Sequence, residues 1–132
     1  MKILEIGKVD LASLCYLNKE RYPFLLESVN HNDNNRYSIL FAFPSESIVL
    51  NSLSDFDFLN ELESQYKSSN LNSNLPFSGG WFVYLSYELI GQIEPILSRE
   101  LHTSELPIAY AVKIPSAIII DYKLNTTYLI DQ

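Results

Sequence analysis

Apolar and polar residues alternate in short runs along most of the chain, a pattern typical of β-strands with one buried face. Gly, Pro, Asn, Asp and Ser separate these runs, as they do where strands end in turns. One of the runs, Trp81–Tyr87, is rich in aromatic residues and is expected to lie centrally in a sheet. The runs expected to be strands are Lys2–Ile6, Phe24–Ser28, Arg36–Phe43, Ser47–Leu53, Trp81–Tyr87, Ile108–Lys113, Ala117–Asp121 and Thr126–Ile130.

Helical spacing of apolar residues appears in two places. Asp10 is a suitable N-cap for a short helix over Leu11–Leu17. Ser54 is a suitable N-cap for a second helix over Asp55–Lys67, whose apolar residues fall at positions 58, 59, 62 and 66. A third segment, Glu88–Leu97, is expected to be helical or irregular.

Short turns rather than helical crossovers connect most of the expected strands. Phe43–Glu46 is expected to turn Arg36–Phe43 and Ser47–Leu53 into a hairpin, whereas residues 31–35, 68–74 and 99–105 are polar loops. Neighbouring strands joined in this way are antiparallel. The sequence therefore predicts an α+β fold, a largely antiparallel β-sheet with roughly two to three helices packed on it, in one domain with one core.

The composition narrows the range of functions. The 132 residues include 16 acidic and 9 basic ones, a formal charge of −7, and no Lys/Arg cluster, so neither a nucleic acid nor an anionic membrane is expected as a partner. Cys15 is the only cysteine, which rules out a disulfide within the chain. We expect no signal peptide, because Met1–Leu11 has no long apolar run, and no run of ~18 apolar residues occurs in the sequence. We expect a cytoplasmic protein.

The usual catalytic motifs are missing from the sequence. It contains no GxSxG, HExxH, P-loop or GxGxxG pattern. Gly79-Gly80 is expected to form a tight turn or bulge before Trp81, although a pair of glycines can also cradle an anion with backbone N–H groups. No residue is predicted to be catalytic and none to bind a metal.

Two stretches combine polar and aromatic side chains in a way that suits a small ligand. Glu27 and Ser28 follow Leu26 at one strand end, and Arg36-Tyr37-Ser38 begins the next strand after a short loop. Together they would offer an acceptor for an ammonium group, a hydroxyl donor and an aromatic wall, which suits a zwitterionic aromatic amino acid. Ordinary strand ends would produce the same spacing. The predicted ligand-binding residues are Leu26, Glu27, Ser28, Arg36, Tyr37 and Ser38.

Three stretches make the chain resemble the N-terminal region of component I of anthranilate synthase and aminodeoxychorismate synthase. Their order and approximate spacing match over nearly the whole of residues 1–132, and together they are moderately specific. Leu106-Pro107 and Asp121 add fainter support. The three stretches are Leu25–Ser28, Arg36–Ser38, and Pro76–Gly80 running on to Tyr84–Leu89.

The resemblance implies a role in chorismate metabolism. The complete family protein converts chorismate with ammonia from a glutamine amidotransferase partner, component II, and requires Mg²⁺. Its catalytic residues and metal-binding glutamates lie in a C-terminal half, which these 132 residues would not include. The chain is therefore expected to hold no cofactor and to pack against that half. It is expected to bind a ligand or to serve as a scaffold rather than to catalyse. Removing that half could also expose apolar surface and promote self-association.

The family's N-terminal half holds a tryptophan pocket, and Glu27, Ser28, Tyr37 and Ser38 match its motifs. The run Leu75–Gly80 favours the folate-branch enzyme, aminodeoxychorismate synthase component I, which acts in p-aminobenzoate synthesis. One alternative is anthranilate synthase component I with a tryptophan feedback site. The other is a stand-alone amino-acid-binding or interaction module. Val83 and Ser86 depart from the family, which often has glycine at those positions.

Overall fold

The computed structural model describes residues 1–29, 35–66, 74–97 and 105–132. The chain forms two compact units, and each is assembled from separate stretches of sequence. The first unit comprises Met1–Ser45, Asn70–Gly80 and Lys113–Gln132, and the second comprises Glu46–Ser69 and Trp81–Val112. Most of the polar loops expected at 31–35, 68–74 and 99–105 lie outside the described residues.

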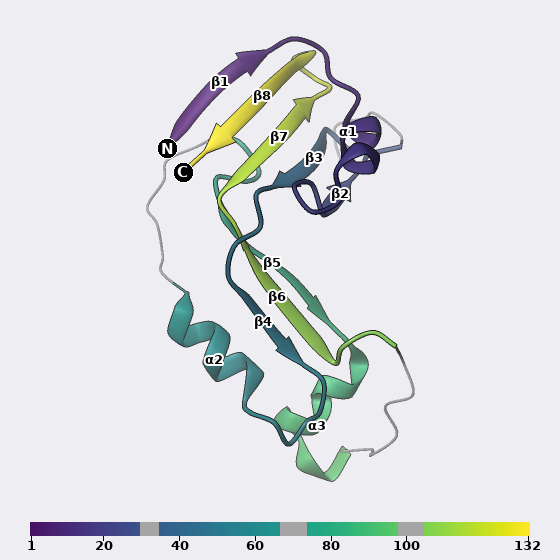
Figure 1. Cartoon of the computed structure of the whole chain (residues 1–132), viewed down its shortest axis with the longest axis vertical. Coiled ribbons are helices and arrows are strands. Elements are labelled where there is room, and N and C mark those ends of the chain that lie inside the picture. The colour runs from purple at the N-terminus through teal and green to yellow at the C-terminus, as the bar shows by residue number, and fades with distance from the viewer. Residues whose placement is uncertain (30–34, 67–73, 98–104) are drawn as a thin grey trace. The chain divides into compact units, whose positions relative to one another are not determined.

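The first unit is built on a five-stranded antiparallel sheet. Its strand order is β1-β8-β7-β3-β2, so that β8 lies between β1 and β7 (Figure 1). Lys2 of β1 pairs with Asp131 of β8, and Tyr37 of β3 pairs with Asp121 of β7. The strands are β1 (Lys2–Ile6), β2 (Phe24–Leu26), β3 (Tyr37–Ala42), β7 (Ser116–Asp121) and β8 (Thr126–Asp131).

Apolar side chains cover both faces of this sheet. On one face helix α1 (Leu11–Leu17) buries Leu11 against Leu40 and Ile118. The Asp10 carboxylate accepts a hydrogen bond from the backbone N–H of Ser13 at 3.1 Å, which confirms the expected N-cap. On the other face Ala117, Ile119 and Ile130 form a second cluster, which is joined by Tyr37, Ile39, Leu75 and Phe77.

The second unit is a smaller layer of strands and helices. Three strands, in the order β4-β6-β5, pack against helix α2 (Phe58–Gln65), whose Phe58 is fully buried with Leu50 and Ala109. A run of short helical segments follows β5: the 3₁₀ turn Tyr87–Leu89, helix α3 (Ile90–Ile93) and the 3₁₀ turn Pro95–Leu97. The strands are β4 (Ser47–Leu50), β5 (Gly80–Leu85) and β6 (Ala109–Ile114).

These elements confirm the predicted α+β class with antiparallel strands and a few helices. The strands divide into two sheets, and each unit has its own core instead of the single core expected from the length. Within the described parts of the chain, no helix is both long and apolar enough to cross a membrane.

The prediction that β3 and β4 form a hairpin is wrong. Strand β3 pairs with β2 and β7, whereas β4 pairs with β6. Phe43 causes the separation because it adopts a left-handed φ of 58° and donates its N–H to the carbonyl of Arg21 at 2.8 Å. Pro44 follows and has no N–H with which to continue a ladder, so the chain leaves the first sheet before β4 begins.

The expected position of the aromatic strand and the expected start of the second helix are also wrong. Strand β5 lies at an edge of its sheet, because β6, with the small buried residues Ala109 and Ala111, takes the centre. Helix α2 begins at Phe58, and Asp57 rather than Ser54 caps it by accepting the Asn60 N–H at 3.0 Å. The helix ends at Gln65, before the expected Lys67.

Gly79 and Gly80 form the tight turn that the sequence predicted. Both have positive φ, 98° and 151°. A Cβ on Gly79 would lie 2.2 Å from the side chain of Gln132, whose amide donates to the Ser78 carbonyl at 2.9 Å. The two glycines therefore let Phe77 pack edge-on against Phe41, with ring centroids 5.0 Å apart, while the chain turns into β5.

Candidate functional site

The two predicted stretches lie side by side where β2 and β3 pair. Leu26 is paired with Ile39, so the chain after Leu26 runs beside Ser38 and Tyr37. The hydroxyl of Ser28 donates to the carbonyl of Tyr37 at 2.6 Å, and the Ser28 N–H donates to the hydroxyl of Ser38 at 3.0 Å. These bonds extend the β2–β3 contact past the last residue of β2. We call this region the β2–β3 site.

A tyrosine that the sequence analysis missed completes the hydrogen-bond chain. The Tyr122 hydroxyl lies 3.0 Å from the hydroxyl of Ser38, and either can be the donor. Ser38 is 1% exposed, so its hydroxyl needs such partners to offset the loss of water. Tyr122 follows β7 directly, and the β3–β7 register places it at this end of the sheet. That pairing was not readable from the sequence, because the segments are far apart in the chain.

Tyr37 and Ser38 face opposite sides of the sheet, because successive residues of a strand alternate. The Tyr37 ring belongs to the cluster around Ile119, and the guanidinium of Arg36 lies 4.8 Å from the ring centroid. Ser38, by contrast, lies on the face that carries Leu40. The aromatic ring beside the serine hydroxyls is therefore that of Tyr122, not the predicted wall from Tyr37.

Arg36 binds Asp121, which is the second residue that the sequence analysis did not place in the site. The Nε and Nη2 atoms of Arg36 donate to the two carboxylate oxygens at 2.8 and 2.5 Å. The carboxylate is 1% exposed and also accepts the N–H groups of Lys123 and Leu124. The sequence did hold a signal for this pair: Asp121 ends an aliphatic strand, and a buried carboxylate requires a cationic partner.

The electrostatics of this pair follow from its hydrogen bonds. The bond from Arg36 lowers the pKa of Asp121 below its ordinary value and outweighs burial, which acts in the opposite direction; the two backbone donors add to the lowering. The same bond raises the pKa of Arg36. Both groups are charged at neutral pH, so the pair fixes the β7–β8 turn to the start of β3. Arg36 thus has a structural role that does not depend on a ligand.

Leu26 and Glu27 are exposed, with Leu26 at 52%. The β2–β3 site therefore presents an apolar side chain and a carboxylate to solvent beside a partly buried network of hydroxyl groups. Such a surface can accept hydrogen bonds from a cationic group and pack against an apolar one.

A hollow of about 410 Å³ lies in the second unit, whereas the six predicted ligand-binding residues belong to the first. It is open to solvent and mostly apolar, and Glu63 is its charged lining residue. None of the six predicted ligand-binding residues takes part in it. The lining residues are Leu59, Leu62, Glu63, Tyr66, Trp81 and Val83.

The magnesium ion implied by the resemblance does not fit the parts of the chain that the structure describes. Magnesium prefers oxygen ligands, chiefly carboxylates. Within residues 1–29, 35–66, 74–97 and 105–132, no three side chains of His, Cys, Asp or Glu gather closely enough to hold a metal ion. We assign no chemical step to a metal here.

Comparison with known proteins gives two curated relatives. Anthranilate synthase component 1 of Lactococcus lactis is 27% identical over 99% of this chain and 32% of its own length. The chain is similar to anthranilate synthase component I. A component I-like protein of Synechocystis is 28% identical over 77% of this chain and 22% of its own length. The chain thus spans about a third of the first relative and less of the second.

Both names support the resemblance at the level of the enzyme family, and neither singles out aminodeoxychorismate synthase. No family model matches the chain.

Proposed function

We propose that this chain is the non-catalytic part of a chorismate-using synthase of the anthranilate synthase component I type. We further propose that its β2–β3 site binds the charged end of an aromatic amino acid, with tryptophan as the ligand. One observation carries the second part: Ser28 bonds directly to Tyr37 and Ser38, so both motifs of the resemblance meet at one place in space. Similarity to the two relatives supports the first part.

Hydrogen-bond roles define how the ligand would be held. A serine hydroxyl has one proton and two lone pairs. Because the proton of Ser28 goes to the Tyr37 carbonyl, its lone pairs remain to accept from a ligand. Glu27 is exposed next to it, and an ionised carboxylate can accept hydrogen bonds but cannot donate them. Both groups therefore suit the ammonium end of an amino acid rather than its carboxylate.

The anthranilate branch is favoured by the names of the relatives. The folate branch, with aminodeoxychorismate synthase component I, is the second candidate, and the run Leu75–Gly80 was the feature that favoured it. Leu75 and Phe77 pack on the sheet and Gly79 makes a turn, so this run already has a structural reason for its sequence. We therefore rank the anthranilate branch first.

The chemistry of such a synthase is assigned to polypeptide outside these residues, since the chain spans 32% of its first relative. In this proposal, chorismate conversion, Mg²⁺ binding and ammonia delivery by a glutamine amidotransferase belong to the whole enzyme and to its partner. The chain supplies a ligand site and a scaffold in the cytoplasm.

Isothermal titration calorimetry with L-tryptophan tests the binding site. We expect binding by the wild-type chain and a loss of about 1–2 kcal/mol on Ser28→Ala, the scale of one hydrogen bond to a charged group. Ser45→Ala is the matched control, because the Ser45 hydroxyl also donates to a backbone carbonyl of the first unit, that of Lys113 at 3.3 Å. Absence of heat at millimolar L-tryptophan, or equal losses in both variants, contradicts the proposal.

A second measurement separates the two branches. The resemblance implies a feedback site in anthranilate synthases and a structural site in some aminodeoxychorismate synthases. Protein purified without added amino acid can be dialysed, denatured and analysed for released tryptophan by mass spectrometry. Tryptophan that dialysis removes supports the anthranilate branch, whereas tryptophan retained in a fixed ratio to protein supports the folate branch.

A further inference from the structure

Among the strands that the structure describes, β6 is the only one that pairs with β5, and no described strand lies on the other side of β5. Strand β5 lies at the end of the order β4-β6-β5 (Figure 1). The N–H of Ser86, just after the strand, donates to the Ile108 carbonyl at 2.8 Å. Backbone groups alternate in direction along a strand. The N–H and C=O groups of Trp81, Val83 and Leu85 therefore point away from β6, toward the free edge.

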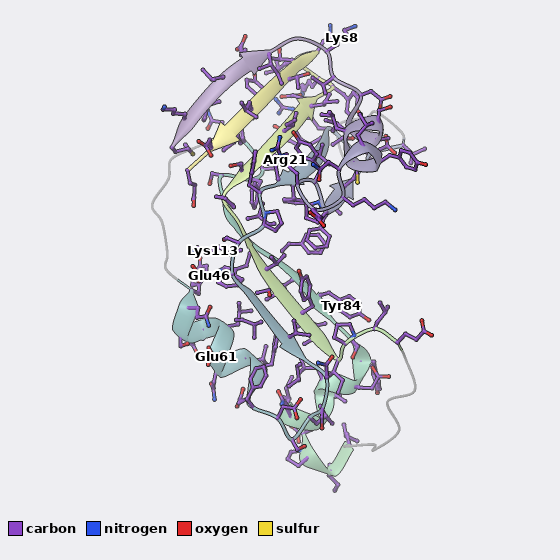
Figure 2. All side chains as sticks on the ribbon, in the orientation of Figure 1. Lys8, Arg21, Glu46, Glu61, Tyr84 and Lys113 are labelled. Carbon is purple, nitrogen blue, oxygen red and sulfur yellow. The ribbon has the colours of Figure 1, made fainter. Side chains whose placement is uncertain are left out.

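This edge lacks the protection that the other edge strands of the described sheets have. Natural proteins blunt sheet edges with charges, prolines or very short strands. Strand β1 carries Lys2 and Glu5, β2 has only three residues, and β4 has four residues preceded by Glu46 (Figure 2). Strand β5 has six residues, none of them charged and none proline. Among the edge strands of the two described sheets, β5 is therefore the one best suited to pairing.

The side chains of β5 add apolar surface on both faces of that edge. Val83 is 40% exposed and Leu85 is 49% exposed, and alternation places both on the face that carries Trp81. Tyr84, labelled in Figure 2, is 37% exposed and lies on the opposite face. The hollow beside α2 runs along the same strand, with Trp81 and Val83 in its lining.

We propose that β5 pairs antiparallel with β5 of a second copy of this chain, about a two-fold axis at Val83. In this register Val83 lies opposite Val83 of the second copy, and Leu85 lies opposite Trp81 in both directions. The contact is isologous, so one short strand is its own complement. The added strand would direct its Leu85 side chain toward the hollow beside Trp81.

The absence of charge on β5 allows a second copy to occupy this edge. The chain has a formal charge of −7, so two copies repel each other overall. No residue from 68 to 87 is charged, and β5 lies inside that stretch. Pairing through β5 therefore places uncharged residues directly opposite one another, whereas a basic partner would gain nothing from the strand itself.

Light scattering coupled to size exclusion tests the dimer. We expect the wild-type chain to show a concentration-dependent dimer, and Val83→Lys to raise its dissociation constant by about tenfold or more, because two like charges would face each other at the axis. Val49→Lys is the matched control: Val49 is 39% exposed on β4, the opposite edge strand of the same sheet, and its replacement should leave the dimer intact. A wild-type chain that stays monomeric at about 1 mM overturns the proposal and assigns the edge to a different polypeptide.

Cysteine cross-linking tests the register and does not depend on the lysine variants. In a Cys15→Ala background, Val83→Cys should form a disulfide-linked dimer under mild oxidation, because residues that exchange both backbone hydrogen bonds have Cα atoms about 5.5 Å apart, within disulfide range. Val49→Cys in the same background should not. Circular dichroism checks that each variant is folded. Equal cross-linking of the two variants would show random collision and overturn the proposal.

Discussion

Arg36 and Asp121 are 85 positions apart in the chain, and the guanidinium of the first holds both oxygens of the second's carboxylate. The contact ties the start of β3 to the end of β7. Asp121 also holds the turn into β8 through the N–H groups of Lys123 and Leu124. One buried carboxylate thus fixes three strands of the sheet on which the β2–β3 site is built.

Replacing this carboxylate should destabilise the first unit. Asp121→Asn should lower the free energy of unfolding by about 1–3 kcal/mol, because the amide cannot accept all four hydrogen bonds and leaves buried donors unpaired. Urea denaturation followed by circular dichroism measures the change. Asp131→Asn is the control, since Asp131 is exposed and accepts one bond, from Ser116. A control that loses as much as Asp121→Asn would refute this account.

Stability should fall in acid for the same reason. The pKa of Asp121 lies below the ordinary value of 3.8, so the unfolded chain takes up the proton first as the pH falls. The stability that Asp121 contributes is complete above 3.8 and is lost as the pH drops through the lower folded value. Asp10, whose pKa the Ser13 hydrogen bonds lower, acts in the same direction. Urea titrations at a series of pH values should give a shallower acid decline for Asp121→Asn than for the wild type, and parallel declines would contradict the assignment.

Gly79 should tolerate no side chain. Its φ of 98° disfavours an L-residue, and a Cβ would meet Gln132. Gly79→Ala should cost about 1–2 kcal/mol of unfolding free energy. Gly7→Ala is the control, because nothing lies within 4 Å of the added Cβ and its φ is not in the left-handed region. Thermal denaturation compares the two, and equal midpoints would show that the turn at Gly79 is not strained.

Asp57 should matter for helix α2 and Ser54 should not. Asp57 accepts the N–H of Asn60, whereas Ser54 lies ahead of the helix in a turn. Asp57→Ala should therefore cost about 1 kcal/mol, the usual value of an N-cap, and Ser54→Ala much less. Chemical denaturation of both variants decides between the two caps, and a larger loss for Ser54→Ala would favour the cap expected from the sequence.

Local signals in the sequence located most elements but not their partners. Asp10 marked the start of α1 correctly because an N-cap acts within one turn. The second cap was misassigned because Ser54 and Asp57 are both good caps, and the choice depends on Asp55, whose carboxylate accepts the N–H of Ser52 and keeps this segment in a turn. When two neighbouring residues are both suitable N-caps, the packing of the folded chain decides between them, and the sequence pattern carries no information on that packing.

Pairing over long distances in the chain was the part that could not be predicted. The short turn at Pro44 favoured a hairpin, yet the positive φ of Phe43 sends the two strands into different sheets. In the site, Ser28 was expected near Tyr37 because a short loop joins their strands, and the structure places them in contact. Tyr122 and Asp121 reach the same place only through the β3–β7 pairing, so the sequence alone did not connect them to it.

The strand order of the first unit has a consequence for how the protein is made. Strand β1 pairs with β8, and β3 pairs with β7, so β1 and one edge of β3 lack their partners until β7 and β8 have left the ribosome. Until then only the β2–β3 contact can form. Between the synthesis of β3 and that of β7, the nascent chain therefore carries apolar strands that lack their partners, and a chaperone that binds extended segments would find its substrate there.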